Sequence, residues 1–356
     1  MKEILLNHAG KYHIMQPTDA VKLIYQATFG GGHLIKKQET ALKNLRDEYS
    51  NMSHEVAKLY TESLGETSRI YLDSKLSENE LSLIAKIFFA SANHYSTGYD
   101  SADEETKSRF HSRLGLLREL CRDGKFSFSI SELDEYLSTY SAAGYPPVSH
   151  SEAYRNAYKP TYRVIDSRYI RLIDVLTAVS TIQKSSNKRI VVAIDGKCAS
   201  GKTTAAELIC EIFGGEIIHL DDFFLPPTMR TSERLSEPGG NLHRERFIDE
   251  VIPNLKNNKP FSYRQFNCSK MSYSGTPRQI PHCNLIICEG SYSLHPSFGK
   301  YYDIAIFSDI NADEQIHRIR TRDGEYMLTR FINEWIPMEN KYFDTFNIKS
   351  KCDYSI

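Results

Sequence analysis

The chain has 356 residues, of which 40% are hydrophobic and 25% are charged, a composition typical of a globular protein with about two domains. The formal net charge of −1 excludes a global basic field, which argues against nucleic acid or an anionic membrane as a partner. The seven cysteines include no Cys-x-x-Cys pair, and no stretch has the length and apolar character of a membrane segment or signal peptide. These features predict free thiols in a reducing compartment and a cytoplasmic protein.

The first half of the chain reads mostly as helices. Apolar residues recur at helical spacing within residues 19–29, 41–49, 80–92, 113–120 and 167–183, and strand signals are few. A proline- and tyrosine-rich interruption covers residues 140–164, where we interpret His150 as the neighbour of a helix cap. The glycines in Phe29–Ile35 follow a helix and not a strand, so they predict a helix stop. The polar run at residues 184–189 predicts a boundary near residue 186, and therefore a mostly α-helical domain over residues 1–186 whose role the sequence does not assign.

The pattern of apolar residues changes after this boundary. Short, continuous apolar runs at residues 189–195, 216–221, 284–290 and 303–309 alternate with helical segments. Such runs are typical of strands buried on both faces of a parallel sheet. The sequence therefore predicts an α/β domain over residues 187–356.

The stretch from residue 193 to residue 215 passes from an apolar strand through a glycine loop into a helix. It matches G-x-x-x-x-G-K-[ST] with Gly196, Gly201, Lys202 and Thr203 in the context that this phosphate-binding loop requires. Inward-pointing backbone N–H groups and the helix N-terminus favour a triphosphate, Lys202 can reach its outer phosphates, and Thr203 can offer an oxygen to Mg²⁺. The predicted nucleotide-binding residues are Gly196, Lys197, Cys198, Ala199, Ser200, Gly201, Lys202, Thr203 and Thr204.

Further candidates lie downstream. Asp221 and Asp222 follow the second predicted strand, and Glu289 ends the third, at the edge where open α/β sheets keep their ligand groups. A carboxylate there can accept a proton from a substrate hydroxyl or hold the metal and its water shell. An arginine cluster can neutralise charge on a transferring phosphoryl group; it consists of Arg318, Arg320, Arg322 and Arg330. The alternatives are an acidic helix cap, a surface glutamate and a solvated arginine face.

The order of these motifs resembles the uridine kinase and phosphoribulokinase branch of the P-loop kinases, over roughly residues 187–350. "GKCASGKTT" resembles the phosphate loop of that family, "LDDFFLPP" its D-x-F-[YF] segment, "LIICEG" its strand ending in Glu-Gly, and "DINADEQIHRIRTRD" the helix leading to its lid. The resemblance implies that Asp221 is the catalytic base and that Thr203 and Glu289 are Mg²⁺ ligands, with Asp222 as a further candidate. It also implies that Arg322, Arg320 and Arg330 face the phosphates, beside Arg318. The segment after Asp323 is shorter than the usual lid of a uridine kinase.

The acceptor site departs from the family. His243 stands where uridine kinases tend to carry a sugar-binding aspartate, and an imidazole offers one donor and one acceptor where a carboxylate offers only acceptors. Tyr263 and Arg264 lie in the region where relatives line the acceptor pocket with aromatic residues, and Arg330 is a further candidate. The alternative for this region is a β-hairpin that packs its rings into the core.

The leading interpretation is an ATP- and Mg²⁺-dependent kinase of a small-molecule hydroxyl, with a nucleoside as the first candidate acceptor. The nearest alternative is another hydroxyl acceptor, such as glycerate, a pantothenate-like compound or a sugar. A different class is a nucleotide-gated binding protein without acceptor turnover. The expected partners are ATP and a small molecule, and a homo-oligomer is left open.

Overall fold

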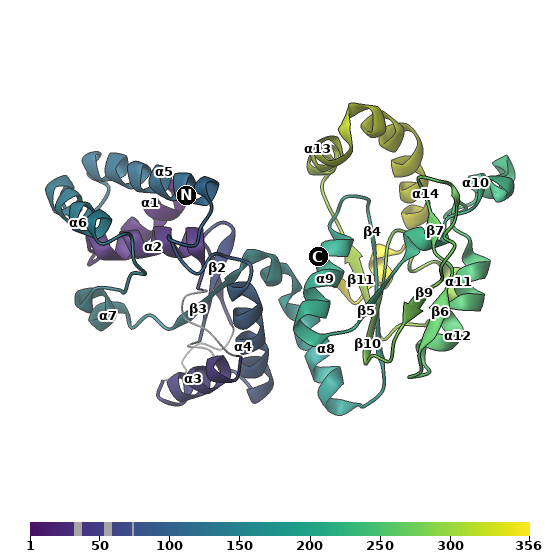
Figure 1. Cartoon of the computed structure of the whole chain (residues 1–356), viewed down its shortest axis with the longest axis horizontal. Helices are drawn as coiled ribbons and strands as arrows, with labels where there is room; N and C mark the ends of the chain where they lie inside the picture. Colours follow the sequence, from purple (N-terminus) through teal and green to yellow (C-terminus); the bar gives the residue numbers. More distant parts are fainter. Residues whose placement is uncertain (32–37, 53–58, 73–74) are drawn as a thin grey trace. The chain divides into compact units, whose positions relative to one another are not determined.

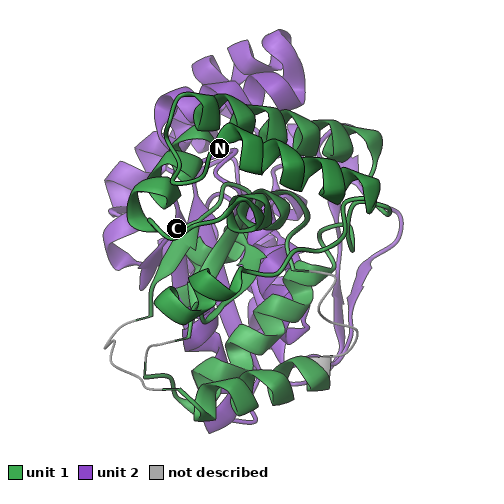
Figure 2. Ribbon diagram, turned by 90° about the vertical axis from the view of Figure 1, so that its left-hand side faces the viewer, with its two compact units in different colours: residues 1–173 green, residues 174–356 purple. Residues whose placement is uncertain are grey.

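The structure is a computed structural model that describes residues 1–31, 38–52, 59–72 and 75–356. The chain divides into two compact units, residues 1–173 and 174–356 (Figure 2). This division falls 13 residues before the boundary near residue 186 that the sequence predicts. The polar run that suggested it marks the end of helix α8 (Ile173–Ser185), which leads directly into the first strand of unit 2.

Unit 1 is mostly helical (Figure 1). The helices predicted at residues 19–29, 41–49, 80–92 and 113–120 are present as α2 (Pro17–Phe29), α3 (Gln38–Ser50), α4 (Glu78–Ala92) and α5 (Glu104–Arg122). The helix predicted at residues 167–183 is the 3₁₀ segment η2 (Ser167–Leu172) followed by α8. The structure adds α1 (Lys2–Lys11), α6 (Ile130–Ala142) and α7 (Glu152–Tyr158). Helix α2 ends at Gly30, whose φ of +61° suits glycine, so the predicted helix stop is confirmed there. The rest of that stretch, residues 32–35, lies outside the described residues.

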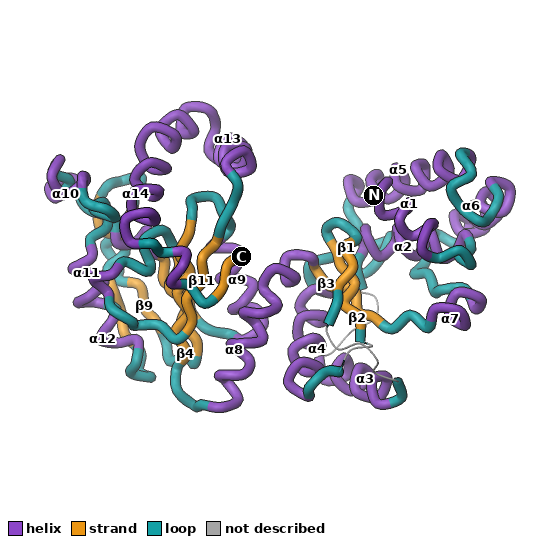
Figure 3. Tube along the Cα trace, turned by 180° about the vertical axis from the view of Figure 1, so that it is seen from behind, coloured by secondary structure: helices purple, strands orange, loops and turns teal. Residues whose placement is uncertain are grey.

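A three-stranded antiparallel sheet of unit 1 was not predicted. It consists of β1 (Thr61–Ser63), β2 (Thr67–Tyr71) and β3 (Tyr162–Asp166), in the order β1-β2-β3 (Figure 3). All five residues of β2 are buried, although they include Arg69, because helix α2 covers the face on which Thr67 and Arg69 hydrogen-bond to Gln26. The five residues of β2 form no continuous apolar run, and polar residues do not alternate with apolar ones along them. The sequence therefore carries neither of the usual signals of a strand.

Unit 2 contains the predicted parallel sheet. Its strand order is β12-β11-β4-β10-β5, and every neighbouring pair is parallel. The four predicted runs form β4 (Ile190–Gly196), β5 (Glu216–His219), β10 (Leu285–Glu289) and β11 (Ile304–Ser308), and β12 (Tyr354–Ser355) adds a short edge strand. Helix α9 (Lys202–Phe213) packs against β4, β5 and β10. Because β10 lies between β4 and β5, the carboxyl ends of these three strands meet at one edge of the sheet.

Smaller elements follow β5 along the chain. They are the single-turn segments η3 (Leu220–Phe223) and η4 (Pro227–Met229), helices α10 (Ser232–Ser236), α11 (Arg244–Glu250) and α12 (Ile252–Leu255), and the antiparallel pairs β6 (Phe261–Tyr263) with β9 (Arg278–Ile280) and β7 (Phe266–Asn267) with β8 (Ser272–Tyr273). Near the carboxyl terminus come α13 (Ala312–Arg330), the π-helical turn η6 (Phe331–Trp335) and α14 (Ile336–Phe346). Within the described part of the chain, none of the helices combines the length and apolar character needed to cross a bilayer.

Candidate functional site

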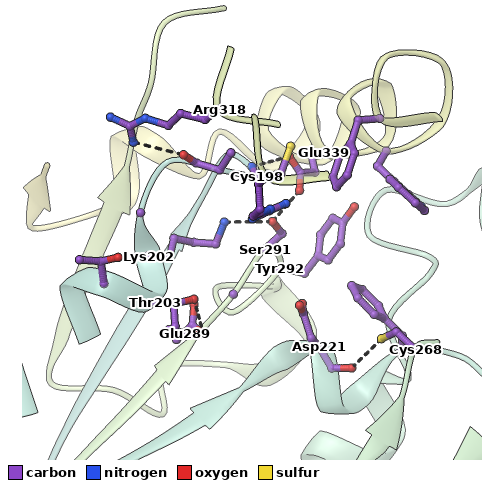
Figure 4. Close-up of a pocket in the computed structure, with 18 of the residues that line it drawn as sticks. Cys198, Lys202, Thr203, Asp221, Cys268, Glu289, Ser291, Tyr292, Arg318 and Glu339 are labelled. Atoms are coloured by element: carbon purple, nitrogen blue, oxygen red, sulfur yellow. Dashed lines mark hydrogen bonds between the residues drawn. The ribbon is translucent and has the colours of Figure 1, made fainter. Parts of the chain in front are cut away.

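A cavity of about 740 Å³ opens at the carboxyl edge of the sheet in unit 2 (Figure 4). Its walls come from the glycine loop, from the ends of β5 and β10, and from α13, η6 and α14. The lining residues used below are Cys198, Ala199, Gly201, Lys202, Thr203, Thr204, Asp221, Phe224, Asn241, Glu289, Ser291, Tyr292, Arg318, Arg322, Phe331, Trp335 and Glu339.

The glycine loop needs both of its glycines. Gly196 has a φ of +138°, and a Cβ there would lie 2.0 Å from the carbonyl oxygen of Ser308 on β11. Gly201 has a φ of +94° at the N-cap of α9. The Nζ atom of Lys202 donates to the carbonyl oxygens of Gly196 at 2.9 Å and Lys197 at 2.8 Å. The lysine is thus held across its own loop, beside the backbone that would surround an anion.

The loop residues divide into two groups. Cys198, Ala199, Gly201, Lys202, Thr203 and Thr204 line the cavity. The side chain of Lys197 turns aside, because its Nζ atom pairs with Asp309 at 2.7 Å and donates to the carbonyl oxygen of Ile310. The backbone of Gly196 and Ser200 shapes the turn, and the side chain of Ser200 is buried.

Thr203 and Glu289 lie side by side. The Thr203 hydroxyl donates to Oε1 of Glu289 at 3.1 Å, and that oxygen also contacts Nδ1 of His219 at 2.5 Å. Hydrogen bonding to Glu289 raises the pKa of His219 above its ordinary value. Glu289 is buried at the end of β10, so its carboxylate is held in place by the strand and by two side chains. A hydroxyl beside a carboxylate is an all-oxygen donor set, which fits the ligand preference of Mg²⁺.

The two adjacent aspartates after β5 point to different surroundings. Asp221 lines the cavity and is exposed within it. Desolvation by the cavity walls, followed by the negative charge of Glu289, raises the pKa of Asp221 above its ordinary value. Asp222 is buried, and its Oδ2 accepts from the Tyr263 hydroxyl at 2.8 Å and from the Gln265 amide at 3.2 Å. Only Asp221 therefore faces the space next to the loop.

The arginines of α13 also fall into two groups, of which one lines the cavity and the other does not. Arg318 and Arg322 line the cavity, and Nη1 of Arg318 donates to the carbonyl oxygen of Ala199 at 3.3 Å. Arg320 pairs with Glu325 on an exposed face. Arg330 pairs with Glu334 and stacks over the ring of Trp335 at 4.8 Å. Helix α13 breaks at Gly324, whose φ is +81°, so the last two turns are redirected after Arg322.

The predicted acceptor residues His243, Tyr263, Arg264 and Arg330 are not among those that line the cavity. Tyr263 is buried on β6 and binds Asp222, and Arg264 pairs with Glu250 at 2.6 Å. A hydrogen bond of 3.3 Å joins Nδ1 of His243 to the hydroxyl of Tyr273, on strand β8. The pairing of β7 with β8 makes the region a β-hairpin with Phe266 buried, as the alternative interpretation held.

The lining residues that sequence reasoning missed include Asn241, Tyr292, Phe331, Trp335 and Glu339. The Oδ1 atom of Asn241 is buried without a hydrogen-bond partner among the described residues. Tyr292 is buried with a φ of +76°, a conformation that costs energy for a residue with a side chain. Glu339 accepts from the Cys198 N–H at 2.9 Å and from the Ser291 hydroxyl at 2.6 Å. No local spacing marks these residues, because each reaches the cavity from a distant loop or helix.

Comparison with known proteins finds solved structures that are similar to about half of the chain. No family model matches the chain, and no curated protein matches it. Similar solved structures are a "Possible Uridine Kinase" from Bacillus stearothermophilus (17% identity, TM-score 0.42, covering 53% of this chain and 99% of that one) and a "fructose transport system kinase" from Silicibacter sp. TM1040 (16%, 0.44, 52% and 98%). A third is the D-glycerate 3-kinase of Cryptococcus neoformans var. grubii (13%, 0.35, 49% and 87%).

The structure itself shows a parallel five-stranded sheet with flanking helices in unit 2 and a mostly helical unit 1. At these identities and TM-scores the likeness carries no argument about function. Function has to be argued from the cavity.

Proposed function

We propose that unit 2 transfers a phosphoryl group from ATP, with Mg²⁺, to a hydroxyl of an uncharged small molecule, with a nucleoside as the first candidate. The observation that carries this proposal is the meeting of three kinds of group in one cavity. These are the lysine of a complete phosphate loop, a hydroxyl–carboxylate pair suited to a metal, and a separate carboxylate, Asp221.

The phosphates would lie against the glycine loop. Its backbone N–H groups and the N-terminus of α9 favour an anion, and Lys202 supplies a positive charge that can move from the loop carbonyls to the outer phosphates. Arg318 and Arg322 reach the same cavity from α13. In phosphoryl transfer these charges stabilise negative charge on the transferring group, which is the main contribution a protein makes to this reaction.

Thr203 and Glu289 would hold Mg²⁺ directly or through its water shell. When bound, the ion would neutralise phosphate charge in the transition state. His219, whose imidazole contacts Glu289, would orient the carboxylate.

Asp221 would orient the acceptor hydroxyl and take its proton as the oxygen attacks. Its raised pKa makes it a stronger base than an ordinary aspartate, which favours proton transfer near neutral pH. Asp222 would act through structure, because its carboxylate holds Tyr263 and Gln265 and so fixes the turn that carries Asp221.

The aromatic and hydrogen-bond-accepting residues of the lining support an uncharged acceptor with an aromatic ring and several hydroxyls. Phe224, Phe331 and Trp335 supply flat apolar surface, while Oδ1 of Asn241 and the carboxylate of Glu339 can accept hydrogen bonds from hydroxyls. The lysine and arginines among the described lining residues come from the loop and α13, where the phosphates would bind. Among those lining residues, a carboxylate-bearing acceptor such as glycerate would therefore have to share the cations that bind the phosphates.

The test is acceptor-dependent release of ADP by the full chain. Purified protein with ATP and Mg²⁺ would be given uridine, cytidine, adenosine, D-glycerate and a hexose in turn. We expect stimulation by at least one nucleoside and none by D-glycerate. Tight ATP binding without stimulation by any acceptor would contradict a kinase and favour the nucleotide-gated binding protein.

Two lysine variants make the test specific. Lys202→Ala removes a charge that stabilises the transition state and should lower turnover by about a hundredfold or more. Lys300→Ala removes an exposed lysine of the same unit and should leave turnover unchanged. Equal turnover by the two variants, both folded, would locate the activity elsewhere.

A further inference from the structure

A second cavity, of about 400 Å³, lies within unit 1. It lies between α2, α3 and β3, and its polar lining includes Lys22, Gln26, Thr40, Asn44, His150 and Tyr162. None of the roles proposed for unit 2 involves these residues. Their hydrogen bonds show which of the polar groups are already satisfied and which are not.

Lys22 is a half-buried cation with a neutral partner. Its Nζ atom donates to the carbonyl oxygen of Val148 at 2.8 Å, and no carboxylate of the described residues comes within 4.0 Å of it. Burial, together with the positive charge of Arg69, lowers the pKa of Lys22 to about 8. A desolvated ammonium group with two unused donors and no counter-ion is costly, and an anion in the cavity would remove that cost.

The carboxylate of Asp19, whose charge acts on Lys22, already has its full set of hydrogen-bond donors. Asp19 accepts from the backbone N–H groups of Gln16 and Ser151, from the Ser151 hydroxyl at 2.7 Å, and from Nδ1 of His150 at 2.8 Å. These four donors account for the accepting capacity of the carboxylate, so Asp19 forms no hydrogen bond with Lys22 and acts on it only through its charge.

The other polar groups of the wall are fixed by the same network. Because Nδ1 of His150 donates to Asp19, its Nε2 accepts from the Tyr162 hydroxyl at 2.7 Å, and burial lowers the pKa of His150 to about 4 and keeps it neutral. Oε1 of Gln26 accepts twice from the buried Arg69, which turns Nε2 of Gln26 toward the Tyr162 oxygen. Hydrogen bonds within the protein therefore fix the orientation of the His150, Tyr162 and Gln26 side chains without a ligand.

The described residues that line the cavity carry one more positive than negative charge. Arg163 is paired with Glu48 at 2.5 Å, and His150 is neutral, so the unpaired charge is that of Lys22. The Thr40 hydroxyl and the Asn44 amide line the opposite wall on α3 and add neutral donors. A cavity of this size holds a small metabolite and not a polymer.

We propose that the cavity of unit 1 binds a small-molecule oxyanion, a carboxylate or phosphate group, through the ammonium group of Lys22. The site is separate from the phosphate loop and does not depend on the function proposed for unit 2. It gives the helical unit a ligand-binding role.

The test measures protection of Lys22 itself. The full chain is treated with an amine-acylating reagent near pH 8, and peptide mass spectrometry gives a labelling rate for each lysine, with inorganic phosphate, or acetate in a second series, exchanged for chloride at constant ionic strength. At ten times the half-saturating concentration, we expect labelling of Lys22 to slow by about tenfold. Lys43, exposed on α3, is the control and should keep its rate.

Three results would overturn the proposal. Labelling of Lys22 that is unaffected by either anion excludes the site. Equal slowing at Lys22 and Lys43 shows an effect of the salt on the reagent. Protection of Lys202 alone places the anion at the phosphate loop.

Variants give a second readout in the same full chain. Lys22→Arg should keep a saturable rise in melting temperature with phosphate, and Lys22→Met should lose that part of the rise, while Lys43→Met should behave like the parent protein. Lys22→Met removes a desolvated charge and is expected to fold, which circular dichroism checks. An undiminished phosphate effect in folded Lys22→Met contradicts the proposal.

Discussion

The adjacent carboxylates after β5 allow the sharpest test of the proposed chemistry. Asp221 lines the cavity, whereas Asp222 is buried against Tyr263 and Gln265. Asp221→Asn keeps the shape of the side chain and removes its ability to take a proton. We therefore expect kcat to fall by about 10²- to 10⁴-fold, nearer the lower limit because the transition state of phosphoryl transfer is loose. The affinity for ATP should be nearly unchanged.

Asp222→Asn is the matched control. The variant keeps one hydrogen bond but sets an amide N–H against a buried donor, which costs about 1 to 3 kcal/mol of folding stability. We expect a lower melting temperature, with kcat at saturating ATP and acceptor changed only several-fold.

The assay compares kcat, ATP affinity and melting temperature for both variants. Desolvation by the cavity walls and the charge of Glu289 raise the pKa of Asp221, and only its deprotonated form can accept a proton, so kcat of the parent protein should rise with pH through that raised value and then level off. Asp221→Asn should lack this rise. The reasoning is refuted if Asp222→Asn is the inactive variant and Asp221→Asn is nearly normal, with both proteins folded and saturated with ATP.

Three further changes test other parts of the molecule. Gly196→Ala would place a Cβ 2.0 Å from the Ser308 carbonyl oxygen, so ATP affinity should fall by about tenfold or more, and an unchanged titration would contradict the geometry of the loop. Glu289→Gln should raise the Mg²⁺ concentration needed for half-maximal activity, and an unchanged Mg²⁺ titration would remove Glu289 from the metal site. Burial lowers the pKa of His150 from 6.5 to about 4, so the unfolded chain takes up a proton first as pH falls, and up to about 3 kcal/mol of stability present above pH 6.5 is lost by pH 4. His150→Gln should flatten the melting temperature across that window, and an equally steep loss would show that other groups cause it.

The fold of unit 2 could be predicted because its signals are local. Each of the four predicted strands is a short apolar run, and the loop at Gly196 combines its glycines, lysine and threonine within eight consecutive positions. The sheet of unit 1 gave no such signal. Strand β2 buries Thr67, Ser68 and Arg69 through hydrogen bonds to α2 and to Ser167, so its burial does not appear as hydrophobicity.

The candidate site could be predicted only on the side of the phosphates. The predicted residues lie at strand ends or in the segments that follow them, namely Lys202, Thr203, Asp221 and Glu289. A parallel sheet brings such strand ends to one edge, whatever the conformation of the loops. The acceptor side depends on how loops return to that edge. Glu339 contacts a loop residue far from it in the sequence, and no spacing rule connects the two.

Asp195 explains how that distant helix is held against the loop. It is the last residue before Gly196, it is fully buried, and its carboxylate accepts from the N–H groups of Tyr292 and Leu294 and from the Tyr342 hydroxyl. Tyr342 and Glu339 lie three positions apart on α14, and therefore on one face of the helix.

One face of α14 is thus bound twice to the start of the phosphate loop, by Tyr342 through Asp195 and by Glu339 through the Cys198 N–H. Both are hydrogen bonds to a buried carboxyl group, which are among the stronger ones in proteins when that group is ionised. Helix α14 is consequently part of the rigid frame around the cavity. Arg318 and Arg322 reach the same cavity from α13, in the part of that helix that precedes its break at Gly324. The aspartate before the first glycine of the motif therefore has a structural role that the motif alone does not reveal, because it couples the loop to helix α14.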